Sequence, residues 1–361
     1  MDRRLSGAIR EITVPVLAIL AGFLVGTVFI IFAGKNPMEA YKFFNLYVWG
    51  DLSKLGETLV STTPLICTGL AIALAFRCGL FNIGAEGQYL VGQIATAWAG
   101  FFFTMPGWLP PAVAGFIHPL FAIFIGMLAA GLYAAIPGVL KAYRGVHEVI
   151  NSIMLNYTAL FFIHWLLLNK MRDPGSGTAA TPRIQPTADF VQGLIQGSRL
   201  HVGLFVALIA AFVVWVFLWK TAAGYEIRAV GFAPGAAEYA GISVKKNIVL
   251  AMLLSGALIG LAAAIQTLGL SRKFYEPMGF TGFGFDGIAV ALVGRNHPLG
   301  VVLAAFLFGA LDRGGQGMQA GADVPKTVMW VVQGTVIFFV AAEGLWRFLQ
   351  TRRTKKEVKT A

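Results

Sequence analysis

Apolar runs of about 20 residues recur along the whole chain, and this pattern constrains the fold more than any other feature. The sequence is 57% hydrophobic and only 12% charged, whereas soluble domains carry about 25% charged residues. Inside a bilayer, backbone polar groups are satisfied within helices because no water reaches them. We therefore expect an all-α, multi-pass membrane protein.

About ten transmembrane helices fit the apolar runs, although several runs are shorter than a simple spanning helix requires. The eighth is the weakest and is a candidate for a broken or re-entrant helix. The expected spans are residues 12–33, 57–76, 86–104, 116–140, 149–169, 201–219, 248–270, 285–295, 298–318 and 326–347.

The spans predict a single transmembrane domain made of two halves, with polar loops between the spans. With both termini in the cytoplasm, most lysines and arginines fall inside, and a basic cluster directly after the last span supports this orientation. The expected parts are a first helix (12–33), a first half (57–169), an external loop (171–199), a cytosolic loop (220–247), a second half (201–347) and a basic cytosolic tail (348–361).

The net charge of +11 is explained by this asymmetry of the loops, so we expect no nucleic-acid partner. Cys67 and Cys78 lie in or beside apolar sequence and are expected to be small packing residues, without a disulfide. The five histidines are scattered, which argues against a metal site, and no cofactor is expected.

A polar, glycine-containing stretch at residues 76–93 separates two apolar runs. It contains Asn82, Glu86 and Gln88 at a depth where polar groups persist only when buried in protein or lining a wet cavity. Transporters build midplane binding sites from helices broken in this way. We expect part of a translocation pathway, with a structural role for Glu86 at a helix N-terminus as the alternative.

Three further polar residues lie in predicted spans. Asn151 and Asn156 are five positions apart in the fifth span, so their faces differ by about 140° and they need not share one cavity. Asp286 opens the eighth span. Amide groups suit a neutral, hydrogen-bonding solute, and no relay of acidic residues for a proton-driven carrier is evident. The candidate pathway residues are Asn82, Glu86, Gln88, Asn151, Asn156 and Asp286.

The cytosolic loop contains a sequence typical of a short helix. Pro234 suits the first turn, and Gly241 suits the position just after the end. Such a helix predicts a rigid knob that presses on a partner, and an ordinary surface loop is the alternative.

Glycine pairs at four-residue spacing predict close helix packing without a further function. They are Gly22/Gly26 and Gly256/Gly260. A faint internal echo also occurs: residues 126–133 followed by 146–150 resemble residues 256–263 followed by 284–289. This predicts an inverted repeat, as in transporters, and chance similarity between apolar helices is the alternative.

Catalytic and nucleotide-binding motifs are missing from the sequence. We find no G-x-x-x-x-G-K-[ST], G-x-S-x-G, H-E-x-x-H or C-x-x-C. The chain is therefore not expected to be an enzyme, and any ATP hydrolysis that drives it belongs to another subunit.

Three stretches form recognisable motifs: residues 79–88, residues 224–231 with 236–242, and residues 284–294. Together they resemble the permease subunits of bacterial ABC importers for branched-chain amino acids, simple sugars and nucleosides. The resemblance covers about residues 55–345, and Glu86-Gly87-Gln88 and residues 146–157 look most like the nucleoside type.

The resemblance implies a multi-pass protein of the bacterial cytoplasmic membrane with several partners. These are a cytosolic ABC ATPase, a second permease that is similar or identical, and an external solute-binding lipoprotein that meets outer loops including 171–199. It implies a nucleoside substrate of the purine type, and a ribose-like sugar is the alternative. It also implies a coupling helix for the ATPase within residues 224–242, with Gly224, Arg228, Ala236, Ala237, Glu238 and Gly241 as coupling residues.

Two other functions stay open on the sequence. An ion-coupled secondary carrier would transport its solute without any other chain. A membrane-embedded enzyme is disfavoured because no catalytic constellation is visible.

Overall fold

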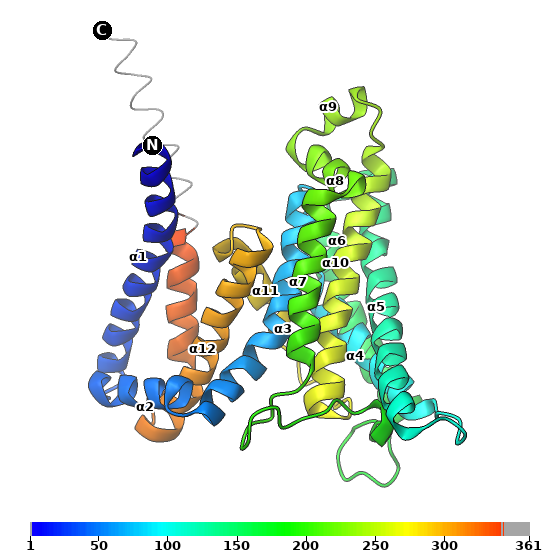
Figure 1. Cartoon of the computed structure of the whole chain (residues 1–361), viewed down its shortest axis with the longest axis horizontal. Helices are drawn as coiled ribbons and strands as arrows, with labels where there is room; N and C mark the ends of the chain where they lie inside the picture. The colour runs from blue at the N-terminus through cyan, green and yellow to red at the C-terminus, as the bar shows by residue number, and fades with distance from the viewer. Residues whose placement is uncertain (1, 341, 343–361) are drawn as a thin grey trace. The chain divides into compact units, whose positions relative to one another are not determined.

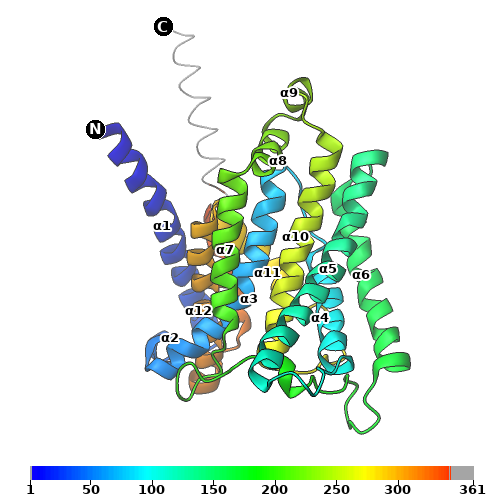
Figure 2. The ribbon, with the colours of Figure 1, turned by 45° about the vertical axis from the view of Figure 1, so that its right-hand side comes forward.

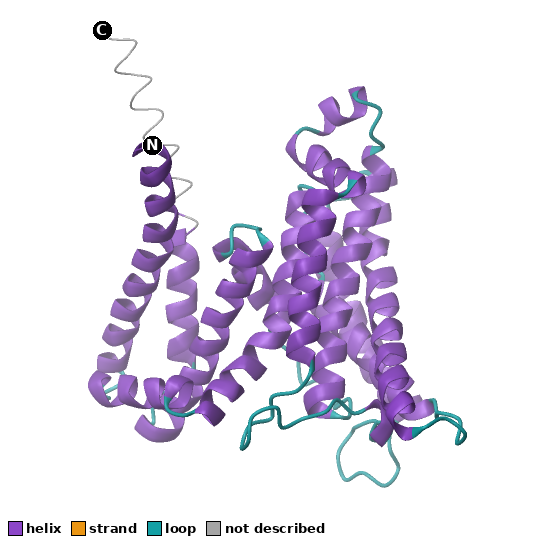
Figure 3. Cartoon of the chain, in the orientation of Figure 1, coloured by secondary structure: helices purple, strands orange, loops and turns teal. Residues whose placement is uncertain are grey.

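The structure is a computed structural model that describes residues 2–340 and 342. Within this part of the chain the regular structure is helical, and no strand occurs (Figure 3). The all-α prediction is confirmed for these residues. The end of the tenth predicted span and the tail 348–361 lie outside them.

Six described helices are long and apolar enough to cross a membrane, so the chain is a multi-pass membrane protein. Shorter apolar helices are Leu17–Phe32 within α1 (Asp2–Phe32), α11 (Phe283–Val293) and Thr327–Val340. The count of ten crossings stays a prediction. The six are α3 (Leu52–Arg77), α5 (Pro111–Arg144), α6 with its π-turn (Glu148–Met171), α7 (Gly203–Lys220), α10 with its π-turn (Val244–Ser271) and α12 (Pro298–Ala322).

The chain divides into two compact units, of which the first comprises Met1–Leu55 and Ala310–Ala361. In this unit a Cβ added at Gly22 would lie 2.9 Å from Val336 Cγ2, and one at Gly26 would lie 2.6 Å from Val332 Cγ2. The packing predicted for this glycine pair is therefore confirmed.

The first unit also contains a helix that the sequence analysis missed, α2 (Pro37–Trp49). Its N-terminus is defined by Asn36, whose side chain accepts a hydrogen bond from the Met38 amide at 3.0 Å. Pro37 follows at the first helical position, where it loses no intrahelical hydrogen bond.

The second unit, Gly56–Gly309, contains most of the bundle. Its most buried spans are α3 and α10, in which 83% and 67% of the apolar 18-residue stretch is buried inside the protein. Helix α5 packs along α10, where Cβ atoms at Gly256 and Gly260 would lie 2.3 Å from Ala134 Cβ and 2.4 Å from the Gly126 carbonyl oxygen. The second glycine pair therefore also serves close packing, as predicted.

The two ends of this unit differ in character (Figures 1 and 2). At one end, the predicted loop 220–247 forms α8 (Ala222–Phe232) and α9 (Pro234–Tyr239), beyond the ends of α3, α5 and α7. At the other end, residues 172–202 are irregular apart from a short turn at Pro186–Ala188. We refer to the α8–α9 end and the loop end.

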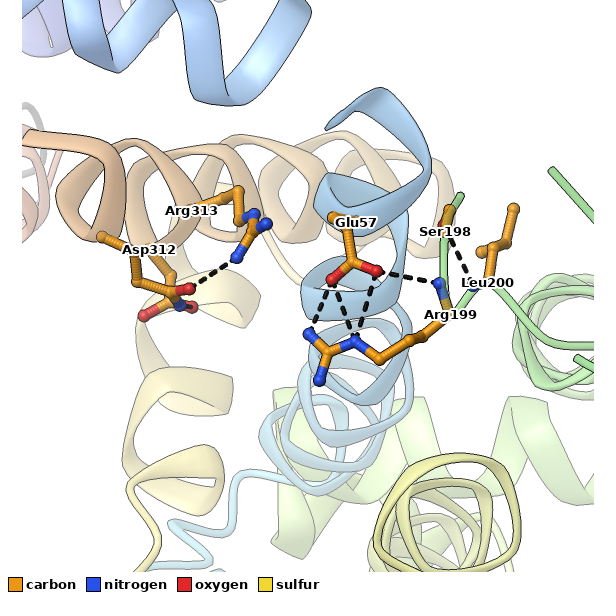
Figure 4. A network of polar contacts seen from close by, with 7 residues as sticks. Glu57, Ser198, Arg199, Leu200, Asp312 and Arg313 are labelled. Carbon is orange, nitrogen blue, oxygen red and sulfur yellow. Dashed lines mark hydrogen bonds and ion pairs between the residues drawn. The ribbon is translucent and has the colours of Figure 1, made fainter. Parts of the chain in front are cut away.

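An ion pair fastens the irregular segment to the start of α3 (Figure 4). Glu57 accepts hydrogen bonds from the Arg199 amide at 2.8 Å and from its guanidinium at 2.6 Å. The hydrogen bond to Glu57 raises the pKa of Arg199 above its usual value. Backbone hydrogen bonds join the same segment to the chain after α10, from Thr181 to Phe274 and from Ile184 to Arg272. The loop end is thus an ordered part of the unit.

The close packing of α5 on α10 predicts that Gly256→Ala lowers stability by about 1–3 kcal/mol, because the added methyl group overfills the contact. The measurement is the apparent melting temperature of the purified protein in detergent. Gly115→Ala is the matched control, since this α5 glycine has open space around its Cβ position. An unchanged melting temperature for Gly256→Ala would contradict the packing.

Candidate functional site

Helix α4 (Ala85–Phe102) and helix α11 both begin in the interior of the second unit, beside each other. A Cβ added at Gly284 would lie 2.7 Å from the Glu86 backbone nitrogen and 2.8 Å from the Ala85 carbonyl carbon. Only a residue without a side chain allows this approach. Two helix N-termini, both carrying partial positive charge, therefore meet at one point.

The Glu86 side chain lies at this meeting point and is completely buried. Its Oε1 accepts hydrogen bonds from the amides of Gly284 (2.7 Å) and Phe285 (3.1 Å). Its Oε2 accepts from the Thr281 amide and hydroxyl, both at 3.1 Å, and from the Gly282 amide at 3.2 Å. Glu86 thus caps α11 while it stands in the first turn of α4. It satisfies otherwise unpaired backbone donors and offsets the charge of both helix ends.

Asn82 and Gln88 form a reciprocal amide pair next to this cap. Asn82 Nδ2 donates to Gln88 Oε1, and Gln88 Nε2 donates to Asn82 Oδ1, both at 2.9 Å. Asn82 Nδ2 also donates to Ser255 Oγ on α10 at 2.9 Å. Both amides are buried, so the pair ties the segment before α4 to α10.

Asn156 of α6 holds the same segment from the other side. Its Oδ1 accepts from the Gly87 amide at 2.8 Å, and its Nδ2 donates to the Ile83 carbonyl at 2.9 Å. Four predicted pathway residues, Asn82, Glu86, Gln88 and Asn156, are therefore brought together, and each bonds to the protein itself. This arrangement favours the structural alternative raised for Glu86 and extends it to the other three.

The remaining two pathway candidates are Asn151 and Asp286. Asn151 is partly buried, and its buried Nδ2 has no hydrogen-bond partner among the residues that the structure describes. Asp286 is partly buried in the first turn of α11. Their roles in a pathway stay predictions.

The two interior helix starts share a short motif that the sequence analysis did not align. Gly84-Ala85-Glu86-Gly87 opens α4, and Gly284-Phe285-Asp286-Gly287 opens α11. Each helix follows an irregular segment after a long span, α3 in one case and α10 in the other. This order makes α3–α4 and α10–α11 a second candidate for corresponding pairs, and the inverted repeat stays a prediction.

A cavity of about 470 Å³ lies beside this network. Gln93 of α4 lines it together with the chain between α10 and α11, including Tyr275, Phe280 and Thr281. Aromatic faces, an amide and a hydroxyl thus border one space. Thr281 links it to the Glu86 cap.

The second candidate site is the knob formed by α8 and α9. Pro234 opens α9, and Gly241 follows its end with a φ of 82°, so both boundary predictions are confirmed. Ala237 is buried, whereas Ala236 and Glu238 are exposed. Gly224 is buried where a Cβ would lie 1.9 Å from the Phe217 carbonyl oxygen, which fixes α8 against the end of α7.

Among the described residues, no three His, Cys, Asp or Glu side chains lie together in a way that would hold a metal ion.

The Glu86 cap predicts that Glu86→Gln lowers stability by roughly 2–3 kcal/mol, because the amide places a donor against backbone donors. The apparent melting temperature in detergent measures this loss. Glu39→Gln is the matched control, since Glu39 is an exposed glutamate in the first turn of α2. A stable Glu86→Gln protein that has lost only transport would instead indicate a direct contact with solute.

The sequence matches the family described as "Branched-chain amino acid transport system / permease component" over residues 55–341. It is 41% identical to a guanosine ABC transporter permease protein of Bacillus subtilis, over 99% of both chains. It is 36% identical to a nucleoside ABC transporter permease protein of Lactococcus lactis, over 92% of both chains.

A glucose ABC transporter permease protein of Haloferax volcanii is 33% identical, over 92% of this chain and 88% of that protein. No solved structure gives a significant match. The family match covers most of the sequence, including α4, α8, α9 and α11. The chain therefore belongs to the family of permease components of branched-chain amino acid transport systems.

Proposed function

We propose that this chain is the transmembrane subunit of an ATP-driven importer that moves a nucleoside, most simply a purine nucleoside, into a bacterial cell. The proposal rests on the sequence identity to guanosine and nucleoside permeases, which is 41% and 36% and extends over 99% and 92% of this chain. The chain itself makes and breaks no covalent bond. A separate cytosolic ATPase, a second permease subunit and an external solute-binding lipoprotein complete the importer.

In this proposal the α8–α9 end faces the cytosol and the loop end faces outward, in the bacterial cytoplasmic membrane. Basic residues at the α8–α9 end support the orientation, since cytoplasmic loops collect lysine and arginine. They include Arg77, Arg144, Arg228, Lys245 and Lys246.

The solute pathway in this proposal runs past the cavity beside Gln93 instead of through the Asn82–Gln88 pair. The pair is saturated by its own hydrogen bonds, whereas Gln93, Tyr275 and Phe280 line open space. Aromatic faces stack on nucleobases, and amide and hydroxyl groups bond to ribose. A simple sugar is the second candidate, because a glucose permease is among the relatives.

The mechanism in this proposal couples ATP binding to the pathway through α8 and α9. Closure of the ATPase moves the exposed knob, which includes Ala236, Glu238 and the backbone at Gly241. Gly224 and Arg228 transmit the movement, because α8 packs on the ends of α7 and α3. A Cβ added at Gly231 of α8 would lie 2.1 Å from the Arg77 carbonyl oxygen of α3, so the knob does not move independently of that span.

Uptake of labelled guanosine by cells that express the importer tests this function. We expect ATP-dependent uptake with all subunits and none with this chain alone, and competition by unlabelled nucleosides but not by ribose or leucine.

In the same assay Gly241→Ala should reduce uptake several-fold. A side chain at its positive φ is strained by about 1–2 kcal/mol, which displaces the end of α9.

Gly235→Ala is the matched control, because Gly235 is an exposed glycine within α9 that has open space around its Cβ position. Membrane levels of both variants should equal the wild-type level. Full uptake by Gly241→Ala would contradict the coupling role. Uptake by this chain alone that an uncoupler abolishes would identify a secondary carrier, and competition by ribose would favour a sugar permease.

A further inference from the structure

A cavity of about 630 Å³ lies at the α8–α9 end of the second unit. It is bounded by the end of α3, by α8 and α9, and by the turn between α11 and α12. Its polar lining includes Arg77, Arg228, Arg295 and Asn296, and its apolar lining includes Phe76 and residues of α8 and α9.

The charges in this cavity are of one sign. None of its described lining residues is acidic. Arg77 and Arg228 share the ring of Trp219, with guanidinium carbons 5.2 and 5.7 Å from the ring centroid. No described carboxylate forms an ion pair with either of these two arginines. Arg77 and Arg228 therefore place positive charge in the cavity that no described carboxylate neutralises.

Two buried polar atoms in the same lining have no hydrogen-bond partner within the described residues. They are Arg228 Nε, a donor, and Asn296 Oδ1, an acceptor. Leaving such a group unpaired costs about 1–3 kcal/mol. An arginine with an unpaired Nε suits a carboxylate, which binds two guanidinium N–H groups side by side.

The surroundings of the cavity indicate what brings that carboxylate. Phe232, which lines the cavity, is 93% exposed, and Tyr239 on α9 is 97% exposed. Helix α9 lies beyond the ends of the neighbouring spans α3, α5 and α7 (Figures 1 and 2). Large aromatic side chains on a part of the protein that projects in this way are typical of a protein contact.

We propose that this cavity accepts an acidic side chain of the ATPase subunit, an inference that rests on the proposed function. The carboxylate pairs with Arg228 and Arg77, while Phe232 and Tyr239 supply the apolar contact. The site thereby adds a charged contact to the knob, with the permease supplying the cationic partner.

The pairing also reaches the interior of the unit. Arg77 Nε donates to the Asn296 carbonyl at 2.9 Å, and its guanidinium donates to the Arg295 carbonyl at 3.4 Å, just after the end of α11. The beginning of α11 is held by Glu86. An acidic group that pairs with Arg77 therefore contacts the residue that binds the turn just after α11, the short helix whose beginning Glu86 caps.

The test compares Arg228→Glu with the matched control Arg144→Glu, since Arg144 is an exposed arginine at the same end and outside the cavity. The affinity of the purified ATPase for the immobilised permease complex is measured in neutral detergent at several salt concentrations. We expect Arg228→Glu to weaken binding at least roughly tenfold and to reduce its salt dependence. Arg144→Glu should bind like the wild type.

Size-exclusion profiles verify folding, and Arg228→Gln replaces Arg228→Glu if the latter does not fold. Equal binding by the Arg228 variant and the wild type would overturn the inference and leave the proposed function intact. Failure of the wild type to bind any ATPase would overturn the proposed function. A loss seen only in bilayers with anionic lipid, and absent in neutral detergent, would assign the cavity to a lipid headgroup and would also overturn the inference.

Discussion

The second unit depends on one buried carboxylate placed where two helix N-termini meet. Without Glu86, the first turns of α4 and α11 would face each other with unpaired amides and partial charges of the same sign. With it, five donors from residues 281–285 are satisfied by two oxygens. The missing side chain at Gly284 lets the backbones approach closely enough for this arrangement.

This constraint gives a structural role to the polar groups around the cap. Asn82, Gln88 and Asn156 close the segments around the cap, so their polarity serves the broken helices. The open cavity beside them is lined by Gln93 and by aromatic side chains that include Tyr275 and Phe280. Helix α11, held by Glu86 at its start and contacted by Arg77 just beyond its end, connects the interior to the cavity beside α8.

Local signals in the sequence predicted local structure well. Pro234 and Gly241 bounded α9, the glycine pairs marked close helix contacts, and the position of Glu86 indicated a helix N-terminus. Partners distant in the sequence were not predictable, because the groups that Glu86 binds lie about 195 positions away. Periodicity also gave no sign of α2, a short helix defined by Asn36 and Pro37. The internal echo paired residues 126–150 with residues 256–289, whereas the short motif shared by α4 and α11 lies at the two interior helix starts. The inverted repeat itself stays a prediction.

Hydrogen–deuterium exchange of the wild-type protein tests the central claim most directly. If Glu86 holds the start of α11, the amides of residues 281, 282, 284 and 285 should exchange as slowly as those in the middle of α10. Fast exchange at these four amides, with slow exchange in α10, would show that water reaches them. In that case Glu86 would face the solute pathway, and its role as the structural centre of the unit would be contradicted.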